Sequence, residues 1–102
     1  MMREFLRGAV RLHILHHAAR DEVHGAWMAK ELADHGYRIS PGSLYPTLHK
    51  METEGLLRSN HLVVDGRARR SYVATAKGRR TLESTKRQLR ELANEVLGDE
   101  TR

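Results

Sequence analysis

The sequence predicts a small, mostly helical domain with one β-hairpin, in the chain order α-α-α-β-β-α. Apolar residues recur at helical spacing in three segments before residue 57 and in a long segment after residue 75. Asp65-Gly66 lies between two short runs rich in Leu, Val and Tyr, as in a hairpin turn. A chain of 102 residues forms one domain with a proportionately small core, so association with a second copy would stabilise it.

The first two predicted helices cover residues 1–20 and 26–34. The first has a wide apolar stripe, which is expected to serve both its own core and a partner: Phe5, Leu6, Ala9, Val10, Leu12, Leu15 and Ala19. The break at residues 21–25 separates it from the second helix, which turns Trp27 or Met28, together with Leu32, inward. Gly36 then makes a tight turn before the third helix.

The third predicted helix lies within Ser40–Leu57. Ser40 is a candidate N-cap with Pro41 at the first helical position, and Gly55 is expected to stop the helix. Pro46 lacks the N–H that would bond back along the helix, so we favour a start near Ser43. The stripe that must be buried is Leu44, Leu48 and Met51.

The hairpin is predicted from Leu56–Val64, the turn Asp65-Gly66 and a returning strand at Arg69–Ala74. Thr75 caps a final helix that runs to about Leu97. Five of its residues form a short heptad seam: Leu82, Thr85, Leu89, Leu92 and Val96.

This seam and the wide stripe of the first helix predict a homodimer. The dimerising side chains are expected to be Leu6, Val10, Leu82, Leu89, Leu92 and Val96. Residues 1–75 then form the first domain, with helix 1–20 also contributing to the dimer. Residues 76–97 are the dimerisation helix, and residues 98–102 are a frayed tail.

Positive charge is concentrated in one part of the chain. The net charge is +5, and residues 65–90 alone hold nine basic and two acidic side chains. This block begins at the hairpin turn, where Arg67, Arg69 and Arg70 follow one another closely. Basic side chains around a hairpin favour contact with phosphates.

Several classes of function are disfavoured by what the sequence lacks. It has no cysteine, no Gly-rich phosphate loop and no Ser–His–Asp set at a recognisable spacing, so we expect neither an enzyme nor a cofactor. It has no secretory segment and no apolar run near 18 residues, so we expect a cytoplasmic protein that does not enter a membrane.

Two helices joined by a tight turn, then a basic hairpin and a long helix, make the winged helix-turn-helix plan, in which residues 1–75 are the DNA-binding domain. The third helix is then expected to enter the major groove of double-stranded DNA while the hairpin lies along the minor groove. A two-fold dimer requires an inverted-repeat operator. The candidate DNA-binding residues are Ser43, Tyr45, Pro46, Thr47, His49, Lys50, Gly66, Arg67, Arg69, Arg70 and Lys30.

Some residues have two interpretations. Tyr45 is either a DNA contact or part of the core, and Lys30 either touches a phosphate or is solvated. Core packing is favoured for Trp27, the single tryptophan, over stacking on an aromatic effector. His13 and His17, spaced i, i+4, are weak candidates for a metal ion in a metal-responsive regulator. A further alternative is an adaptor that uses the same surfaces for protein contact.

The motifs also resemble a known family, the PadR family of bacterial transcriptional regulators. The match lies in S-P-G-S-L-Y-P-T-L-H-K-M-E-T-E-G-L-L at residues 40–57, G-R at 66–67 and R-R-S-Y-V-A-T-A-K-G-R-R-T-L at 69–82, with H-G-A-W-M-A-K-E-L at 24–32 similar to the family's second helix. The short chain is similar to the compact subgroup with a single C-terminal dimerisation helix. The resemblance implies a dimeric repressor that a small, often aromatic, molecule releases from its operator.

Overall fold

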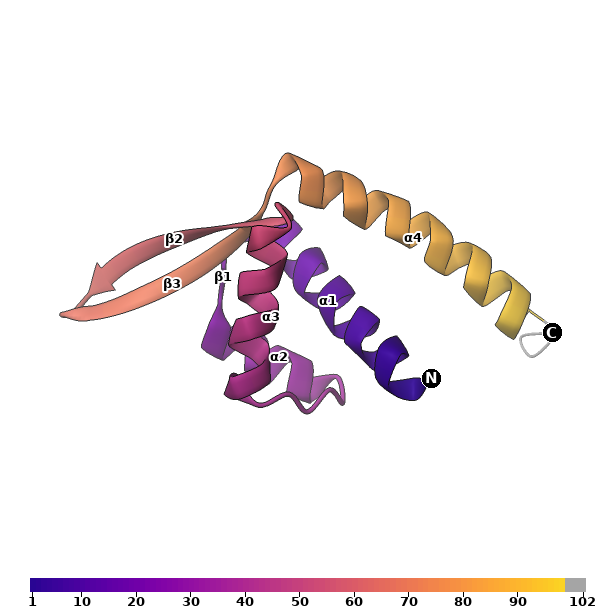
Figure 1. Ribbon diagram of the computed structural model, residues 1–102, viewed down its shortest axis with the longest axis horizontal. Helices are drawn as coiled ribbons and strands as arrows, with labels where there is room; N and C mark the ends of the chain where they lie inside the picture. Colours follow the sequence, from indigo (N-terminus) through magenta and orange to yellow (C-terminus); the bar gives the residue numbers. More distant parts are fainter. Residues whose placement is uncertain (99–102) are drawn as a thin grey trace.

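The computed structural model describes residues 1–98, which form four helices and a three-stranded antiparallel sheet (Figure 1). In chain order the elements are α1 (Met2–Arg20), β1 (Val23–His24), α2 (Gly25–Asp34), α3 (Pro41–Thr53), β2 (Leu57–Val64), β3 (Arg67–Ala74) and α4 (Ala76–Leu97). The predicted α-α-α-β-β-α winged helix is confirmed. Except for Gly98, the predicted tail lies outside the described residues.

One core joins α1, α2, α3 and the base of the sheet. Its most deeply buried side chains are Ile14, Met28, Leu32, Leu44, Leu48, Met51 and Tyr72. The predicted stripe of α3 is therefore buried as expected. Ile14 was absent from the predicted stripe of α1, yet it is fully buried, while Phe5 and Leu6 near the start of the helix are exposed.

The short strand β1 was not predicted. Val23 and His24 pair with Tyr72 and Ser71 of β3, so β3 becomes the central strand, in the order β1-β3-β2. A two-residue strand shows no alternation that a sequence pattern could reveal. Its pairing joins the segment before α2 to the base of the hairpin.

Helix α3 begins at Pro41, so the predicted start near Ser43 was wrong. The Ser40 carbonyl accepts hydrogen bonds from the backbone N–H groups of Ser43 and Leu44, at 2.9 and 2.8 Å, whereas the Ser40 side chain makes no capping bond. Pro46 lies inside the helix, where its missing N–H leaves the Gly42 carbonyl without its usual helical donor. Because Gly42 is exposed, water can solvate that carbonyl and the helix tolerates the proline.

The end of α3 confirms Gly55 as the predicted stop. Gly55 has a φ of 82°, a backbone conformation that favours glycine. Its N–H donates to the Glu52 carbonyl and the Leu56 N–H donates to the Met51 carbonyl, both at 2.9 Å. These two bonds form a Schellman motif, which ends the helix and directs the chain into β2.

The hairpin turn also forms as predicted. Asp65 and Gly66 both have positive φ, 53° and 76°, as a type I′ turn requires. Val64 pairs with Arg67, so β3 begins two residues earlier than expected. The outer part of the hairpin is exposed, including the apolar side chains of Leu62, Val63 and Val64.

The start of α4 is joined closely to the end of α3. Thr75 caps α4 as predicted by accepting from the Gly78 N–H at 2.9 Å, and its hydroxyl donates to the Gly55 carbonyl at 2.6 Å. A Cβ at Gly78 would lie only 2.1 Å from the Leu56 carbonyl oxygen. From this junction the hairpin and α4 project in opposite directions (Figure 1).

The close approach at Gly78 gives a first prediction. Gly78→Ala should lower the free energy of unfolding by about 1–3 kcal/mol or more, because the added methyl group meets backbone that cannot rotate away. Thermal or urea unfolding measures this effect. Gly8→Ala is the matched control, since nothing lies within 4 Å of its added Cβ. Gly8→Ala should stabilise the helix by about 0.5–1 kcal/mol. If Gly78→Ala and Gly8→Ala changed the free energy of unfolding equally, the close contact at Gly78 would not matter for stability.

Candidate nucleic-acid interface

The predicted contact residues of α3 share one solvent-facing surface. Ser43, Tyr45, Pro46, His49 and Lys50 are exposed and Thr47 is half-buried. The opposite side of the helix is fixed in the core by its buried apolar stripe. We call these six side chains the recognition face, and their polarity suits the edges of base pairs in a major groove.

Thr47 has limited hydrogen-bonding capacity on the recognition face. Its hydroxyl donates to the Ser43 carbonyl at 2.8 Å, one turn earlier in the same helix. The hydroxyl hydrogen is therefore engaged, while the oxygen keeps a free lone pair. In this geometry Thr47 can accept a hydrogen bond, for example from the amino group of cytosine or adenine, and its methyl group can contact thymine.

Tyr45 is partly packed within the protein, and its contact with DNA remains a prediction. Its side chain is 49% exposed, and its ring lies directly over Gly25 at the start of α2. A Cβ at residue 25 would come within 2.6 Å of the Tyr45 ring carbon Cε1, so only glycine leaves room for the ring in this position. Gly25 thus positions Tyr45, a role that sequence reasoning did not detect.

The wing arginines lie on both faces of the hairpin. Arg67 pairs with Val64 and Arg69 pairs with Leu62. In the same register, Arg70 pairs with His61. Since successive residues of a strand point to opposite faces, Arg67 and Arg69 share one face and Arg70 lies on the other. Arg70 is on the side of α3, where its charge helps to lower the pKa of Glu52.

Two carboxylates hold the base of the hairpin, and neither was predicted. Glu22 accepts hydrogen bonds from the hydroxyl of the buried Ser71 and, at 3.3 Å, from the Asn60 amide. Glu52 of α3 accepts from the Ser59 hydroxyl and, at 3.2 Å, from the Ser59 N–H. These bonds to serine lower the pKa of both carboxyl groups. The Glu52 bonds hold the base of the wing against α3, whereas the Glu22 bonds hold it to the segment before β1.

The two remaining contact candidates are Lys30 on α2 and Gly66 in the hairpin turn. Lys30 of α2 is exposed, and its ammonium group lies 3.1 Å from the Asp34 carboxylate. This pair is at the surface and one turn apart on a helix, so it leaves the lysine free to exchange partners at small cost. Its contact with a phosphate remains a prediction. Gly66 lies at the tip of the wing, where its φ of 76° serves the turn.

Apolar side chains on α1 and α4 have no partner surface within the described single chain. Leu6 is 42% exposed, and Leu89, Leu92 and Val96 are between 46% and 61% exposed. Leu82 differs, because it is buried in the chain's own core, and Val10 packs partly against that core. The exposed members of the predicted seam therefore lie beyond the part of α4 that packs on α1.

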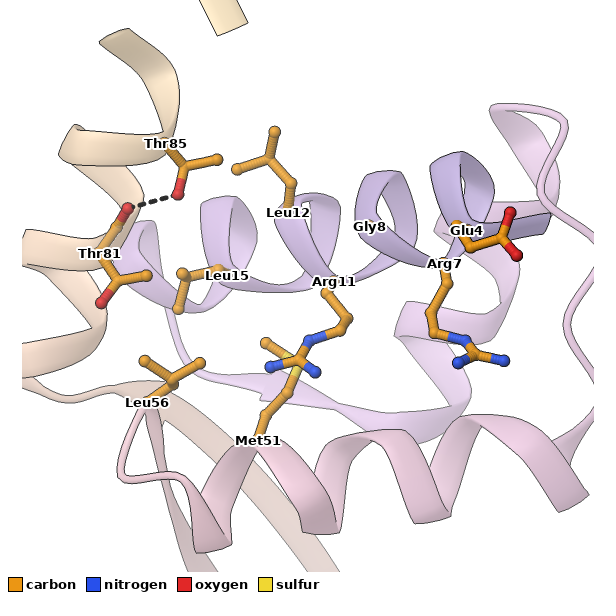
Figure 2. A pocket seen from close by; sticks show the side chains of 10 residues that line it. All are labelled: Glu4, Arg7, Gly8, Arg11, Leu12, Leu15, Met51, Leu56, Thr81 and Thr85. Atoms are coloured by element: carbon orange, nitrogen blue, oxygen red, sulfur yellow. Dashed lines mark hydrogen bonds between the residues drawn. The ribbon is translucent and has the colours of Figure 1, made fainter. Parts of the chain in front are cut away.

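A cavity of about 420 Å³ lies between α1, the end of α3 and α4 (Figure 2). Leu12, Leu15, Met51 and Leu56 form its apolar lining, and Arg11 extends across it toward α3. Arg11 is paired with the Glu54 carboxylate. The cavity thus borders both α3 and α4, the helix predicted to form the dimer.

Comparison with known proteins decides the family. Residues 14–84, more than half of the chain, match the family described as transcriptional regulator PadR-like. The chain belongs to the PadR-like family of transcriptional regulators. This family is one of regulators, not of enzymes as a rule, and the resemblance stated from the motifs is confirmed.

Individual PadR-like proteins agree with this assignment. Transcriptional regulator Rv3488 of Mycobacterium tuberculosis is 65% identical over 100 residues, which cover 98% of this chain and 94% of that protein. A PadR family regulator from Eggerthella lenta is 32% identical with a TM-score of 0.82, covering 94% of this chain and 85% of that one. A PadR-like regulator from Bacillus cereus is 30% identical with a TM-score of 0.83, covering 93% and 94% of the two chains.

The environment of Trp27 corrects the expectation that it packs in the core. Its side chain is 45% exposed, and Met28 takes the buried position of α2. The indole instead packs edge-on against the His17 ring, with the ring centroids 5.1 Å apart. Contact of Trp27 with an effector remains a prediction.

The histidines of α1 also have a neighbour that the sequence did not indicate. Glu31 of α2 places a carboxylate oxygen 3.3 Å from His17 Nε2. Within residues 1–98, no group of three or more His, Cys, Asp or Glu side chains is arranged to hold a metal ion. Within the same residues, no helix is long and apolar enough to cross a membrane.

The contact between Tyr45 and Gly25 gives a second prediction. Gly25→Ala should destabilise the protein by about 1–3 kcal/mol, because the methyl group displaces the Tyr45 ring. In a Tyr45→Ala background the same change should be close to neutral, since the ring is gone. Urea unfolding of the four proteins gives the coupling energy. A cost of Gly25→Ala that is equal in both backgrounds would contradict this contact.

Proposed function

We propose that this PadR-like regulator is a repressor that binds an inverted-repeat operator as a homodimer. In this proposal α3 of each protomer enters a major groove and the wing lies along the adjacent minor groove. The DNA contacts are those of the recognition face, the wing residues Gly66, Arg67, Arg69 and Arg70, and Lys30 on the phosphate backbone.

The observation that carries the proposal is the position of the recognition face beside a wing of fixed direction. The recognition face can read base edges because it is polar and exposed. The wing can bind the phosphate backbone because its three arginines are exposed on both faces of the hairpin. The bonds of Glu52 to Ser59 tie α3 to the base of the wing, and the bonds of Glu22 tie the same base to the segment before β1.

The homodimer is argued from the exposed apolar side chains of α1 and α4. Leu89, Leu92 and Val96 continue the heptad spacing of α4 beyond the chain's own core, and Leu6 lies on the neighbouring α1. A second copy would remove these side chains from water. Two-fold symmetry then places the recognition helices about one turn of DNA, roughly 34–36 Å, apart.

We further propose that a small, aromatic effector releases the DNA. Trp27 is the candidate contact, because its exposed indole can stack on an aromatic ring. The α1–α4 cavity is a second place from which a ligand could change the angle between the DNA-binding domain and the dimer helix.

The wing and the recognition face should differ in a DNA-binding experiment. Replacing Arg67 and Arg69 with Gln should weaken binding to operator and random DNA alike, and should lower the salt slope by about one per lost phosphate contact. Replacing Thr47 with Val and Lys50 with Gln should change the preference among operator variants by about 1–3 kcal/mol per altered base contact. Fluorescence anisotropy at several salt concentrations, with operator variants as competitors, measures both effects.

Two outcomes of this experiment would contradict the proposal. An unchanged salt slope in the arginine variant would exclude the wing from DNA binding. Equal loss of affinity for operators and random DNA in the Thr47 and Lys50 variant would exclude base reading by α3. If the unaltered protein showed neither salt dependence nor preference for an inverted repeat, the adaptor function would be favoured.

The proposed dimer is tested by charging its seam. Leu89→Glu should raise the dimer dissociation constant at least about tenfold, which is 1.4 kcal/mol, because the carboxylate would be buried against the partner. Analytical ultracentrifugation over a range of concentrations measures this change. Asn94→Glu adds the same charge at an exposed position of α4 outside the seam and should leave the dimer intact. Equal dissociation of both variants, or of neither, would argue against this seam.

A further inference from the structure

Two imidazole rings contact one carboxylate where α1 meets α2 and the connector to α3, and a third ring packs beside them. His17 Nε2 and His35 Nε2 lie 3.3 and 3.0 Å from the same oxygen, Oε1 of Glu31. The His13 ring lies between them, with centroid distances of 5.9 Å to His17 and 4.9 Å to His35. We call His13, His17, His35 and Glu31 the histidine cluster.

His13 is suited to the neutral state only. Its Nδ1 atom is shielded from water and has no hydrogen-bond partner among the described residues. Its ring also packs edge-on against Tyr37 of the connector, with the centroids 5.2 Å apart. A proton added to Nδ1 would therefore create a shielded donor with no acceptor, beside two other imidazoles that compete for one carboxylate.

The cluster joins the two parts of the molecule that the proposed function requires to act together. His13 and His17 belong to α1, which carries part of the proposed dimer surface. His35 and Tyr37 belong to the connector that leads into α3, and the Tyr37 N–H donates to the Leu32 carbonyl at 2.8 Å. Repulsion between these groups would thus act between α1 and the helix-turn-helix.

We propose that the histidine cluster is a pH-sensitive switch, which holds α1 against the helix-turn-helix when its imidazoles are neutral and loosens this contact when acid protonates them. DNA is then released in mildly acidic conditions, because the spacing of the two recognition helices is no longer fixed. This inference rests on the proposed function for its effect on DNA, but not for the titration itself.

The direction of the pH effect follows from burial. Burial is the main cause that lowers the pKa of His13 and His17 below the ordinary value of 6.5, and neighbouring imidazoles add to it. The unfolded chain therefore binds more protons than the folded chain just below pH 6.5. The stabilisation is fully present above this pH and is lost as the pH falls through the lowered pKa values.

Other charged groups near the cluster do not supply a second counter-charge for its rings. On α1, the His16 ring lies 4.9 Å from that of His17 and adds to the positive charge when protonated. His16 also shares a groove with Arg20 and, from α4, with Arg79, Glu83 and Lys86, which carry a net positive charge. On α2, Lys30 and Asp34 form a separate pair.

The test compares DNA affinity at pH 7.5 and 5.5 at constant ionic strength. The unaltered protein should lose about tenfold or more in affinity at pH 5.5. This direction is diagnostic, because added positive charge ordinarily strengthens the attraction of a basic protein to phosphates. Circular dichroism should show the helices retained at pH 5.5.

Variants identify the groups responsible. His13→Phe keeps a ring against Tyr37 but cannot titrate, so it should retain its affinity at pH 5.5. Glu31→Gln removes the negative charge that favours the protonated imidazoles, so it should lower the pKa of His13 and His17 further and shift the release to lower pH. If His13→Phe does not fold, His35→Gln takes its place as the variant that removes one titrating ring, because His35 is exposed. His24→Gln removes an exposed histidine of β1 outside the cluster and should behave as the unaltered protein.

Fluorescence of Trp27 gives a readout that does not need DNA. The indole packs against His17, and a protonated imidazole quenches indole emission more than a neutral one does. Emission should fall between pH 7.5 and 5.5 in the unaltered protein, with a lower midpoint in Glu31→Gln. Failure to bind DNA at pH 7.5 would reject the proposed function while this titration still tested the switch.

Four results would overturn the switch. The first is a DNA affinity at pH 5.5 that equals or exceeds the affinity at pH 7.5. The second is a pH response of His13→Phe that is identical to that of the unaltered protein. The third is loss of the helical circular dichroism signal at pH 5.5, which would mean general acid unfolding. The fourth is a zinc-induced change of Trp27 emission and DNA affinity at pH 7.5 that equals the acid effect. That result would assign the cluster to metal binding instead.

Discussion

The approach of Gly78 to the Leu56 carbonyl is the contact on which the arrangement of the molecule depends. At this point the end of α3, the start of β2 and the first turn of α4 meet through backbone groups. Thr75 completes the junction by capping α4 and donating to Gly55 at the same time. Backbone-to-backbone contact permits little adjustment, so the end of α3, the base of the wing and the first turn of α4 keep one position relative to one another.

Most of the fold could be predicted because its signals are local. The Schellman stop at Gly55, the type I′ turn at Asp65 and Gly66, and the cap at Thr75 each depend on residues within one turn of chain. The start of α3 could not be predicted from local signals. The hydrogen bond missing at Pro46 had to be weighed against the solvent exposure of Gly42, and solvent exposure depends on the tertiary structure. The two residues of β1 pair with a strand almost fifty positions away, and their own pattern carries no signal.

In the candidate site, too, the parts with local signals could be predicted and the parts that depend on distant residues could not. The recognition face follows from helical periodicity, and the wing follows from charge next to a turn signal. The groups that hold them in place are remote in sequence, as Glu22 is from Ser71, and no spacing rule brings them together. The error at Trp27 was one of rotation, because adjacent residues on a helix are turned by about 100° and Met28 fills the place expected for the tryptophan.

The exposed outer half of β2 has a consequence for the protein when it is not bound to DNA. This strand is an edge of the sheet, so its outward backbone groups are available to a strand from another molecule. Its exposed run Leu62–Val64 has the apolar, β-branched composition that favours such pairing. Each such residue, however, stands opposite or beside an arginine of β3. Two wings that approached edge to edge would bring these arginines together, so the charge that suits phosphates also keeps separate molecules from aggregating.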